Sequence, residues 1–176
     1  MLKRIARLYK SLNDRRRVSG DPINYARSLG VRVGDGCRFI GVTIETFGTE
    51  PYLIQIGNHV TLTSQVRFIN HDGGVWVLRD KCPDADIIAP IVIGDNTFIG
   101  MSTLIMPGVT IGDNCVIGAG SVVTRDIPSG HVAVGVPARC IKTIAEYEEK
   151  VRQQALHIRS LGQSEKREKL EQTFFP

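Results

Sequence analysis

The chain has 176 residues, few aromatic side chains and no long apolar run. Aromatics make up 6% of the residues, and no stretch reaches the roughly 18 apolar residues that a membrane-spanning helix needs. The opening residues, MLKRIARLYK, lack the apolar core of a secretory signal peptide, so we expect a cytoplasmic protein. The 42% hydrophobic share argues against a wholly disordered chain, and the length fits one domain with a small appendage.

Cysteine is also scarce, with residues at 37, 82, 115 and 140. Their spacings match no zinc or redox motif. We therefore expect free buried thiols in a reducing compartment and no metal site.

The net charge of +4 is unevenly spread. Residues 1–17 hold seven Lys or Arg against one acid, which leaves the remainder of the chain slightly negative. This distribution is unlike that of a nucleic-acid-binding body, which carries its basic groups on the folded surface. Leu2, Ile5, Leu8 and Leu12 are three or four residues apart and predict an amphipathic helix packed on the body, with contact to an anionic membrane surface as the alternative.

The main pattern in the chain is an apolar residue at every sixth position. The unbroken run is Ile93, Ile99, Ile105, Ile111, Ile117 and Val123. The residue four places after each is mostly small: Thr97, Thr103, Val109, Cys115, Ser121 and Ile127. The period returns at Ile56, Leu62 and Phe68, and more weakly at Val33 and Phe39. A six-residue period fits a short strand followed by a turn, so three units close a coil of about 18 residues. Stacked coils of this kind form a parallel β-helix, whereas an antiparallel sandwich predicts irregular spacing.

The period breaks at two places before Ile93. The spacing from Phe68 to Ile93 exceeds four repeats by one position, and residues 71–89 are predicted to form a loop extruded from the helix. The spacing from Phe39 to Ile56 falls one position short of three repeats, so a second irregular segment is expected around residues 43–51.

The same reasoning divides the chain into three parts. Residues 1–30 are predicted to form a basic helical segment, residues 31–141 the β-helix, and residues 142–176 a C-terminal helix and tail. That helix is expected over residues 142–161, where apolar residues recur every three or four positions, with Gly162 as its stop.

Three features together resemble a known family. They are the six-residue repeat, the loop that opens with Asn70 and His71, and the closing runs GAGSVVTRDIPSG and VAVGVPARCIK. The chain resembles hexapeptide-repeat acyltransferases of the xenobiotic, maltose and galactoside acetyltransferase branch. The resemblance implies a left-handed parallel β-helix, a homotrimer with active sites between subunits, and acetyl-CoA as cosubstrate with no metal. The segments FGTEPYLIQIG and INHDGGVWVLRD look most similar to small acetyltransferases of bacterial surface-polysaccharide and nucleotide-sugar pathways, which implies a sugar acceptor.

Acetyl transfer requires a base to remove a proton from the attacking acceptor, and a neutral imidazole suits that role near neutral pH. Of the four histidines, at 59, 71, 131 and 157, only His71 opens the predicted loop and matches the family's catalytic histidine. Its ring needs an orienting partner, for which Glu50, Asp72 and a backbone carbonyl all remain open. Asn70 is predicted either to donate to the oxyanion or acceptor, or to serve as a turn residue.

The resemblance also implies binding residues. The backbone near Met101 and Ala119, one coil apart, is expected to bond the pantetheine amides of coenzyme A. Its nucleotide end is expected to meet four further residues: Thr124, Arg125, Arg139 and Lys142. The family often has Lys where this chain has Arg125. Three loop residues are candidates for acceptor contact: Asp72, Trp76 and Arg79. The alternative use of Trp76 is packing across the subunit boundary, and that of Arg79 is pairing with Asp80 or Asp84.

The leading prediction is therefore an acetyl-CoA-dependent transferase that acetylates the amine of a nucleotide-linked sugar or a hydroxyl of a polysaccharide precursor. A xenobiotic O-acetyltransferase and a non-catalytic structural trimer are the alternatives. A metal-dependent carbonic anhydrase on the same helix type is disfavoured, because it needs clustered histidine ligands and the four histidines here are far apart in sequence.

Overall fold

The computed structural model describes residues 12–175, so the predicted contacts of Leu2, Ile5 and Leu8 lie outside the described residues. The chain separates into two compact units, residues 1–145 and 146–176. Within the described range, no helix combines the length and apolarity that crossing a membrane requires.

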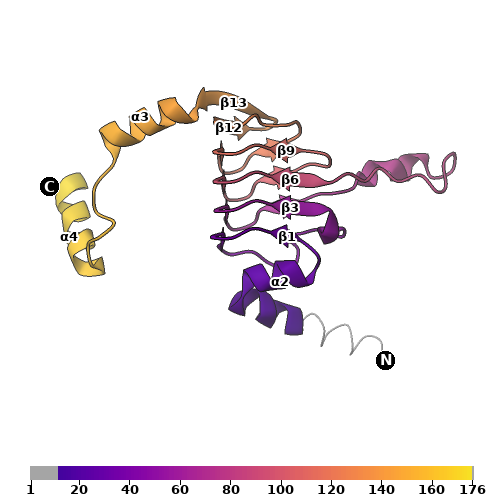
Figure 1. The fold of residues 1–176 in the computed structure, drawn as a ribbon, viewed down its shortest axis with the longest axis horizontal. Coiled ribbons are helices and arrows are strands. Elements are labelled where there is room, and N and C mark those ends of the chain that lie inside the picture. Colours follow the sequence, from indigo (N-terminus) through magenta and orange to yellow (C-terminus); the bar gives the residue numbers. More distant parts are fainter. Residues whose placement is uncertain (1–11, 176) are drawn as a thin grey trace. The chain divides into compact units, whose positions relative to one another are not determined.

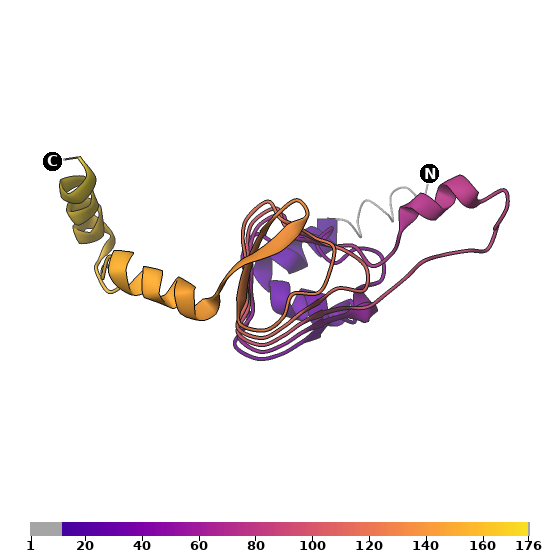
Figure 2. The same ribbon diagram turned by 90° about the horizontal axis from the view of Figure 1, so that it is seen from above.

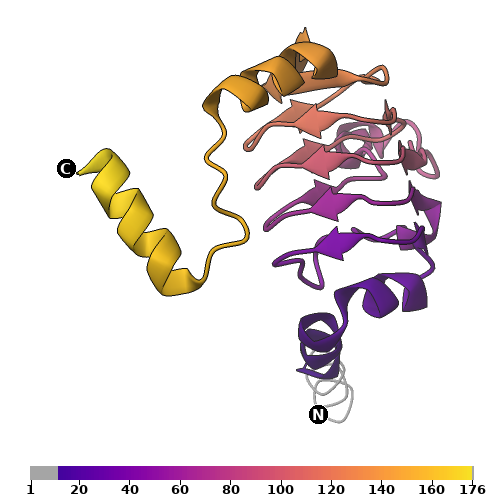
Figure 3. The same cartoon turned by 60° about the vertical axis from the view of Figure 1, so that its left-hand side comes forward.

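The body of the first unit is a parallel β-helix with three sheets (Figures 1 and 3). Sheet A contains β1 (Arg32–Val33), β3 (Ile54–Ile56), β6 (Ile91–Ile93) and β9 (Thr110–Ile111). Sheet B contains β2 (Arg38–Phe39), β4 (Thr61–Leu62), β7 (Phe98–Ile99), β10 (Val116–Ile117), β12 (His131–Gly135) and β13 (Ala138–Thr143). Sheet C contains β5 (Arg67–Phe68), β8 (Leu104–Ile105) and β11 (Val122–Val123). Viewed from above, successive coils lie over one another around a common interior (Figure 2).

The interior is the predicted column of aliphatic residues. All six residues of the unbroken run, from Ile93 to Val123, are at most 1% exposed. The small residues four places on are buried too, and their hydroxyl groups donate to backbone carbonyls; Thr103 donates to Gly100 O at 2.7 Å and Ser121 to Gly118 O at 2.6 Å. Stacking thus removes each apolar side chain from water, while no buried hydroxyl is left unpaired at these two corners.

The strand register explains both breaks in the period. Where the repeat is regular, partner residues such as Ile93 and Ile111 lie a single three-repeat coil apart in the sequence. Phe68 pairs with Ile105, which is about twice as far along the sequence, because the whole 71–89 segment is inserted into that coil. In the first coil, Phe39 pairs with Leu62, so that coil is also longer than a regular one.

The extra length of the first coil replaces a strand of sheet C. In the described chain, no strand lies between β2 and the short helix η1 (Pro51–Leu53). Phe47 fills the interior there, with its ring centroid 6.0 Å from that of Phe39 and 5.9 Å from that of Phe68. Phe68 N also donates to Thr46 O at 2.8 Å, so this segment remains attached to the coil above it.

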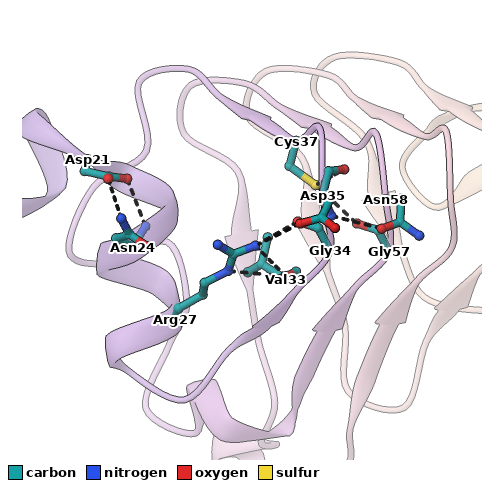
Figure 4. Close-up of polar contacts among 9 residues, drawn as sticks. All are labelled: Asp21, Asn24, Arg27, Val33, Gly34, Asp35, Cys37, Gly57 and Asn58. Atoms are coloured by element: carbon teal, nitrogen blue, oxygen red, sulfur yellow. Dashed lines mark hydrogen bonds and ion pairs between the residues drawn. The ribbon is translucent and has the colours of Figure 1, made fainter.

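Helices precede the first coil. Residues 12–20 are helical and α2 spans Pro22–Ser28. Asp21 caps α2 by accepting from Asn24 N at 2.9 Å, and this bond is the largest cause of the lowered pKa of Asp21. Figure 4 shows how Arg27 of α2 then reaches the first coil, where Nη2 donates to Val33 O at 2.9 Å.

The C-terminal part of the chain contains two features that the six-residue pattern did not predict. β13 pairs with β12 antiparallel, so the β-helix ends in a hairpin rather than in another parallel coil. The single helix predicted over residues 142–161 ends at Gln154 as α3 (Ile144–Gln154), and a second helix, α4 (Gln163–Phe174), follows. Within the described residues, neither helix contains a buried side chain.

The cysteine prediction holds only in part. All four cysteines are free, but Cys115 is the buried one, while Cys82 and Cys140 are exposed. Burial raises the pKa of the Cys115 thiol.

Candidate active site

The two irregular segments meet at His71. Gly48 allows the first segment to turn, since its φ is +63° and a Cβ there would lie 2.8 Å from Phe68 O. The turn places Thr49 and Glu50 immediately before η1, and Leu53 N donates to Glu50 O at 3.0 Å.

His71 is held through one ring nitrogen. Its Nδ1 lies 3.1 Å from Glu50 Oε2 and 3.1 Å from Thr49 Oγ1. The Thr49 hydroxyl also donates to Glu50 Oε2 at 2.6 Å, and this bond is the largest cause of the lowered pKa of Glu50. The carboxylate of Glu50, whose side chain is 18% exposed, therefore faces the ring in its charged form.

Among the orienting partners left open by the sequence, the structure brings Glu50 to Nδ1. The Asp72 carboxylate instead accepts from Gly74 N at 2.8 Å and caps η2 (Gly73–Leu78). Thr49 was missed by the sequence reasoning, because a single exposed Thr beside a Glu carries no recognisable pattern.

Asn70 holds the two ends of the 71–89 loop together. Its side chain is buried and its Nδ2 donates to Ala89 O at 3.2 Å, while Ala89 N donates to Asn70 O at 2.9 Å. Next to this pair, His71 and Ile88 form an antiparallel bridge. Asn70 Oδ1 is buried without a hydrogen-bond partner in the described chain. Asn70 thus has a structural use, and its predicted role toward the oxyanion or acceptor remains a prediction.

A cavity of about 300 Å³ adjoins these residues. It is lined by Glu45, Gly48, Thr49, Arg67, Phe68, Ile69, Asn70, His71 and Leu104. Arg67 and Glu45 form an ion pair at 2.5 Å on its wall, and neither residue was singled out from the sequence. The cavity therefore combines a candidate base with a carboxylate and a guanidinium that are able to bond a polar ligand.

The 71–89 loop is braced by Arg79. Its Nη1 donates to Pro83 O and to Ala85 O, each at 2.8 Å, and its Nη2 pairs with Asp86 at 3.1 Å. The predicted pairing with Asp80 or Asp84 is wrong, since Asp86 is the partner. Trp76 is 74% exposed on η2, so a large apolar surface is left open in this loop.

Four of the predicted coenzyme A residues occupy two corners of the coil. Met101 and Ala119 lie where the chain passes from sheet B to sheet C, one coil apart. Thr124 and Arg125 follow β11 at the corner between sheets C and A, where His71 follows β5 two coils away.

Within one chain, sheet C separates Met101 and Ala119 from His71. Met101 O already accepts from Gly120 N at 2.7 Å. Arg139 and Lys142 lie on β13 opposite Val134 and Val132, and Arg139 Nη1 donates to Ala138 O at 2.9 Å. The structure thus joins His71 with Glu50 and Asn70, but does not bring the predicted pantetheine residues to them.

Comparison with known proteins identifies the repeat and a relative over most of the chain. The family described as bacterial transferase hexapeptide (six repeats) matches residues 90–125. Protein CapG of Staphylococcus aureus is 53% identical over 153 residues, which cover 87% of this chain and 87% of CapG.

Two named acetyltransferases match in narrower regions. The galactoside O-acetyltransferase of Escherichia coli (strain K12) is 58% identical over 55 residues, which are 31% of this chain and 27% of that enzyme. The crystal structure of a maltose O-acetyltransferase from Clostridium difficile 630 has a TM-score of 0.52 and 33% identity, covering 68% of this chain and 73% of that one. The chain thus spans most of CapG but under a third of the galactoside enzyme's length.

The family match and the solved structures imply that the parallel β-helix is left-handed. The residues that match the repeat, 90–125, include the regular part of the buried aliphatic column. Because the repeat model matches and the maltose O-acetyltransferase is 33% identical over 68% of this chain and 73% of its own, the chain belongs to the hexapeptide-repeat acetyltransferase family.

Proposed function

We propose that this protein transfers an acetyl group from acetyl-CoA to a sugar, with His71 as the general base. The observation that carries the proposal is the contact of His71 Nδ1 with the ionised Glu50, beside a mainly apolar cavity whose lining also includes Glu45 and Arg67. A carboxylate in this position orients the imidazole and stabilises the imidazolium that forms during proton transfer.

The reaction balances without a further reactant. His71 accepts the proton of the acceptor hydroxyl or amine as the acceptor oxygen or nitrogen bonds to the acetyl carbon. The carbon–sulfur bond of the thioester then breaks. His71 donates its proton to the departing sulfur, and coenzyme A is released as the free thiol. Asn70 is a candidate for stabilising the oxyanion that forms between these steps.

A sugar acceptor is supported by the chemistry of the cavity wall and by the relatives. The Arg67–Glu45 pair offers donors and acceptors in fixed planes, which suits the hydroxyl groups of a sugar ring. Two relatives are named for acetylation of a galactoside and of maltose. The predicted acceptor contacts of Asp72, Trp76 and Arg79 lie in the adjoining loop, and surface-polysaccharide or nucleotide-sugar synthesis is the proposed setting.

Coenzyme A is proposed to bind between copies of the chain. Met101 and Ala119 lie at a different corner from His71, so a complete site needs this corner from one copy and His71 from another. Thr124, Arg125, Arg139 and Lys142 are proposed to meet the nucleotide end.

The β-helix, residues 31–141, then carries the reaction, flanked by residues 1–30 and 142–176. We expect a homotrimer by light scattering, and a monomer that retains full activity would contradict a shared site.

The proposal is tested by His71→Ala with His59→Ala as the matched control. His59 lies at the corner between sheets A and B, away from His71 in the sequence of sheets, and its Nδ1 contacts Asn96 Oδ1 at 2.7 Å. Release of free coenzyme A is measured with acetyl-CoA and a panel of nucleotide-linked amino sugars, simple sugars and a xenobiotic alcohol. We expect His71→Ala to lower kcat by about 10²- to 10⁴-fold and His59→Ala to leave it within about twofold. Full activity of His71→Ala would refute His71 as the base, and turnover confined to the xenobiotic would refute the sugar acceptor.

A further inference from the structure

The hydroxyl group of Thr49 contacts both the ring of His71 and the carboxylate of Glu50. Two oxygens, Thr49 Oγ1 and Glu50 Oε2, each lie 3.1 Å from Nδ1 of the ring. A third contact, 2.6 Å long, joins the two oxygens to each other. The three atoms form a closed triangle with at most two hydrogens, one from the Thr49 hydroxyl and one on Nδ1, so the placement of the first constrains the second.

The hydrogens of this triangle are determined by the donors available. An ionised carboxylate only accepts, so the short Thr49–Glu50 bond must use the hydroxyl hydrogen of Thr49. Thr49 has a single such hydrogen, and its oxygen is therefore left to accept from Nδ1. Both oxygens that face Nδ1 are then acceptors, and Nδ1 must carry the hydrogen of the neutral ring.

We propose that Thr49 is a positioning residue that fixes His71 in the tautomer with hydrogen on Nδ1 and thereby leaves Nε2 as the basic nitrogen. This inference rests on the proposed function of His71. Without the hydroxyl, Nδ1 would face a single acceptor, and the ring would be held less firmly against rotation and tautomer exchange.

The surrounding charges are consistent with this assignment. Besides His71, the charged group that acts on Glu50 is Asp86 of the loop, whose negative charge raises the pKa of Glu50. Asp86 is itself paired with Arg79 at 3.1 Å. The hydroxyl of Thr49 is the largest influence in the opposite direction, so it keeps Glu50 an acceptor toward the ring.

Thr49 is not placed there to fill the core. Its side chain is exposed, and the neighbouring interior is filled by Phe47, which is fully buried. The turn is set by Gly48 and by the bond from Phe68 N to Thr46 O, neither of which involves the Thr49 side chain. Removing the hydroxyl group of Thr49 is therefore expected to change the positioning of His71 without changing the stability of the fold.

The test compares Thr49→Val, which keeps the shape and loses the hydroxyl, with Thr49→Ser, which keeps the hydroxyl. We expect Thr49→Val to lower kcat about 10-fold with KM for acetyl-CoA unchanged, and Thr49→Ser to restore most of it. Nitrogen-15 NMR of the His71 ring in the full-length protein should show one tautomer, protonated at Nδ1, in the wild type. In Thr49→Val it should show a mixture. A wild-type ring protonated at Nε2, or unchanged kcat and spectrum in Thr49→Val, would overturn the assignment.

A double-mutant cycle separates positioning from a merely local structural effect. In a Glu50→Ala background the triangle no longer exists, so adding Thr49→Val should change kcat by less than about twofold. A further 10-fold loss in that background would show that Thr49 acts independently of Glu50 and would refute the proposal. Unchanged melting temperatures in all variants confirm that folding is not what is measured.

The outcomes also distinguish this inference from the proposed function. If His71→Ala is inactive while Thr49→Val is fully active, Thr49 is not a positioning residue and His71 remains the base. If His71→Ala is fully active, the base assignment fails whatever Thr49→Val does.

Discussion

The regular coils of residues 90–127 and the interrupted coils of residues 31–89 are built on the same three sheets but differ in what they contain. In the regular coils, each strand residue pairs with the residue three repeats further along the chain, and the aliphatic column is buried. The interrupted coils keep the buried column but carry two insertions, and the contacts of His71 with Thr49 and Glu50 come from these insertions.

The breaks in the repeat bring the polar side chains of the candidate site together. Parallel coils stack about 4.8 Å apart, so insertions at neighbouring corners of consecutive coils must come close in space. The segment around Thr49 replaces a sheet C strand, and the loop that begins at His71 leaves the next coil directly after β5. Regular strands supply the frame, and the two departures from regularity supply polar side chains that the aliphatic column has no room for.

The sharpest contrast between the two regions is in stability. Ile111→Ala removes a side chain that is fully buried in the regular coils, and we expect the free energy of unfolding to fall by about 2 to 5 kcal/mol. Thr110→Ala, the exposed neighbour in β9, should change it by less than about 0.5 kcal/mol. Both are measured by denaturant unfolding. Loss of activity in folded Ile111→Ala would contradict the separation of frame and site.

The second prediction concerns the join between the two regions, at Asn70. Asn70→Ala removes the donor to Ala89 O and leaves that carbonyl without its side-chain partner, so we expect a loss of about 1 to 3 kcal/mol. Limited proteolysis should then cut residues 71–89 faster than in the wild type. Asp72→Ala, which removes an exposed cap in the same loop, is the control and should cost less than about 1 kcal/mol. Equal costs would mean that Asn70 does not hold the loop ends.

The regular coils were predictable from sequence, and the reason is that one period specifies them completely. Every sixth residue from Ile93 to Val123 has the same environment, so the pattern gives both the buried positions and the strand spacing. The phase breaks also gave the location of both insertions. They gave no conformation for either one, because the turn at Gly48 depends on Phe68 from the coil above it.

The candidate site was predictable only for those residues whose chemical type suggested a role. His71 and Glu50 were candidates, and the structure brings them together. Thr49 and the Arg67–Glu45 pair were not, since their contacts arise only when residues far apart in the sequence are stacked in successive coils. The antiparallel β12–β13 hairpin and helix α4 were missed because neither follows the repeat.

The third prediction tests whether the close approach of Gly48 to Phe68 O is needed to position Thr49 and Glu50. Gly48→Ala and Gly130→Ala both place a side chain at positive φ, +63° and +75°, and each should cost about 1 to 2 kcal/mol. Only at Gly48 does the new Cβ meet a backbone oxygen, at 2.8 Å, whereas at Gly130 none of the described residues lies within 4 Å. We expect Gly48→Ala to be less stable by about a further 1 kcal/mol and to lose activity as Thr49 and Glu50 shift. Equal stability of the two variants would show that the first coil adapts without cost.

The smallest expected effect lies on the acid side of the stability curve and again separates the two regions. Asp95 of the regular coils accepts from Asn58 N of the interrupted coils at 2.7 Å, and this backbone bond is the main cause of the lowered pKa of Asp95. Because the folded state binds a proton at Asp95 less readily than the unfolded state, its contribution is present above the usual aspartate pKa and is lost as pH falls through the lowered value. Asp95→Asn should therefore show a shallower loss of stability between about pH 5 and pH 2 than the wild type in denaturant titrations. Asp126→Asn, which removes a carboxylate bonded to Thr110 N at 2.7 Å within the regular coils, is the matched comparison. If both variants reduce the acid-induced loss of stability equally, the bond from Asn58 to Asp95 contributes no more than the bond from Thr110 to Asp126. If only Asp95→Asn does so, the bond from Asn58 to Asp95 contributes to stability against acid and the bond from Thr110 to Asp126 does not.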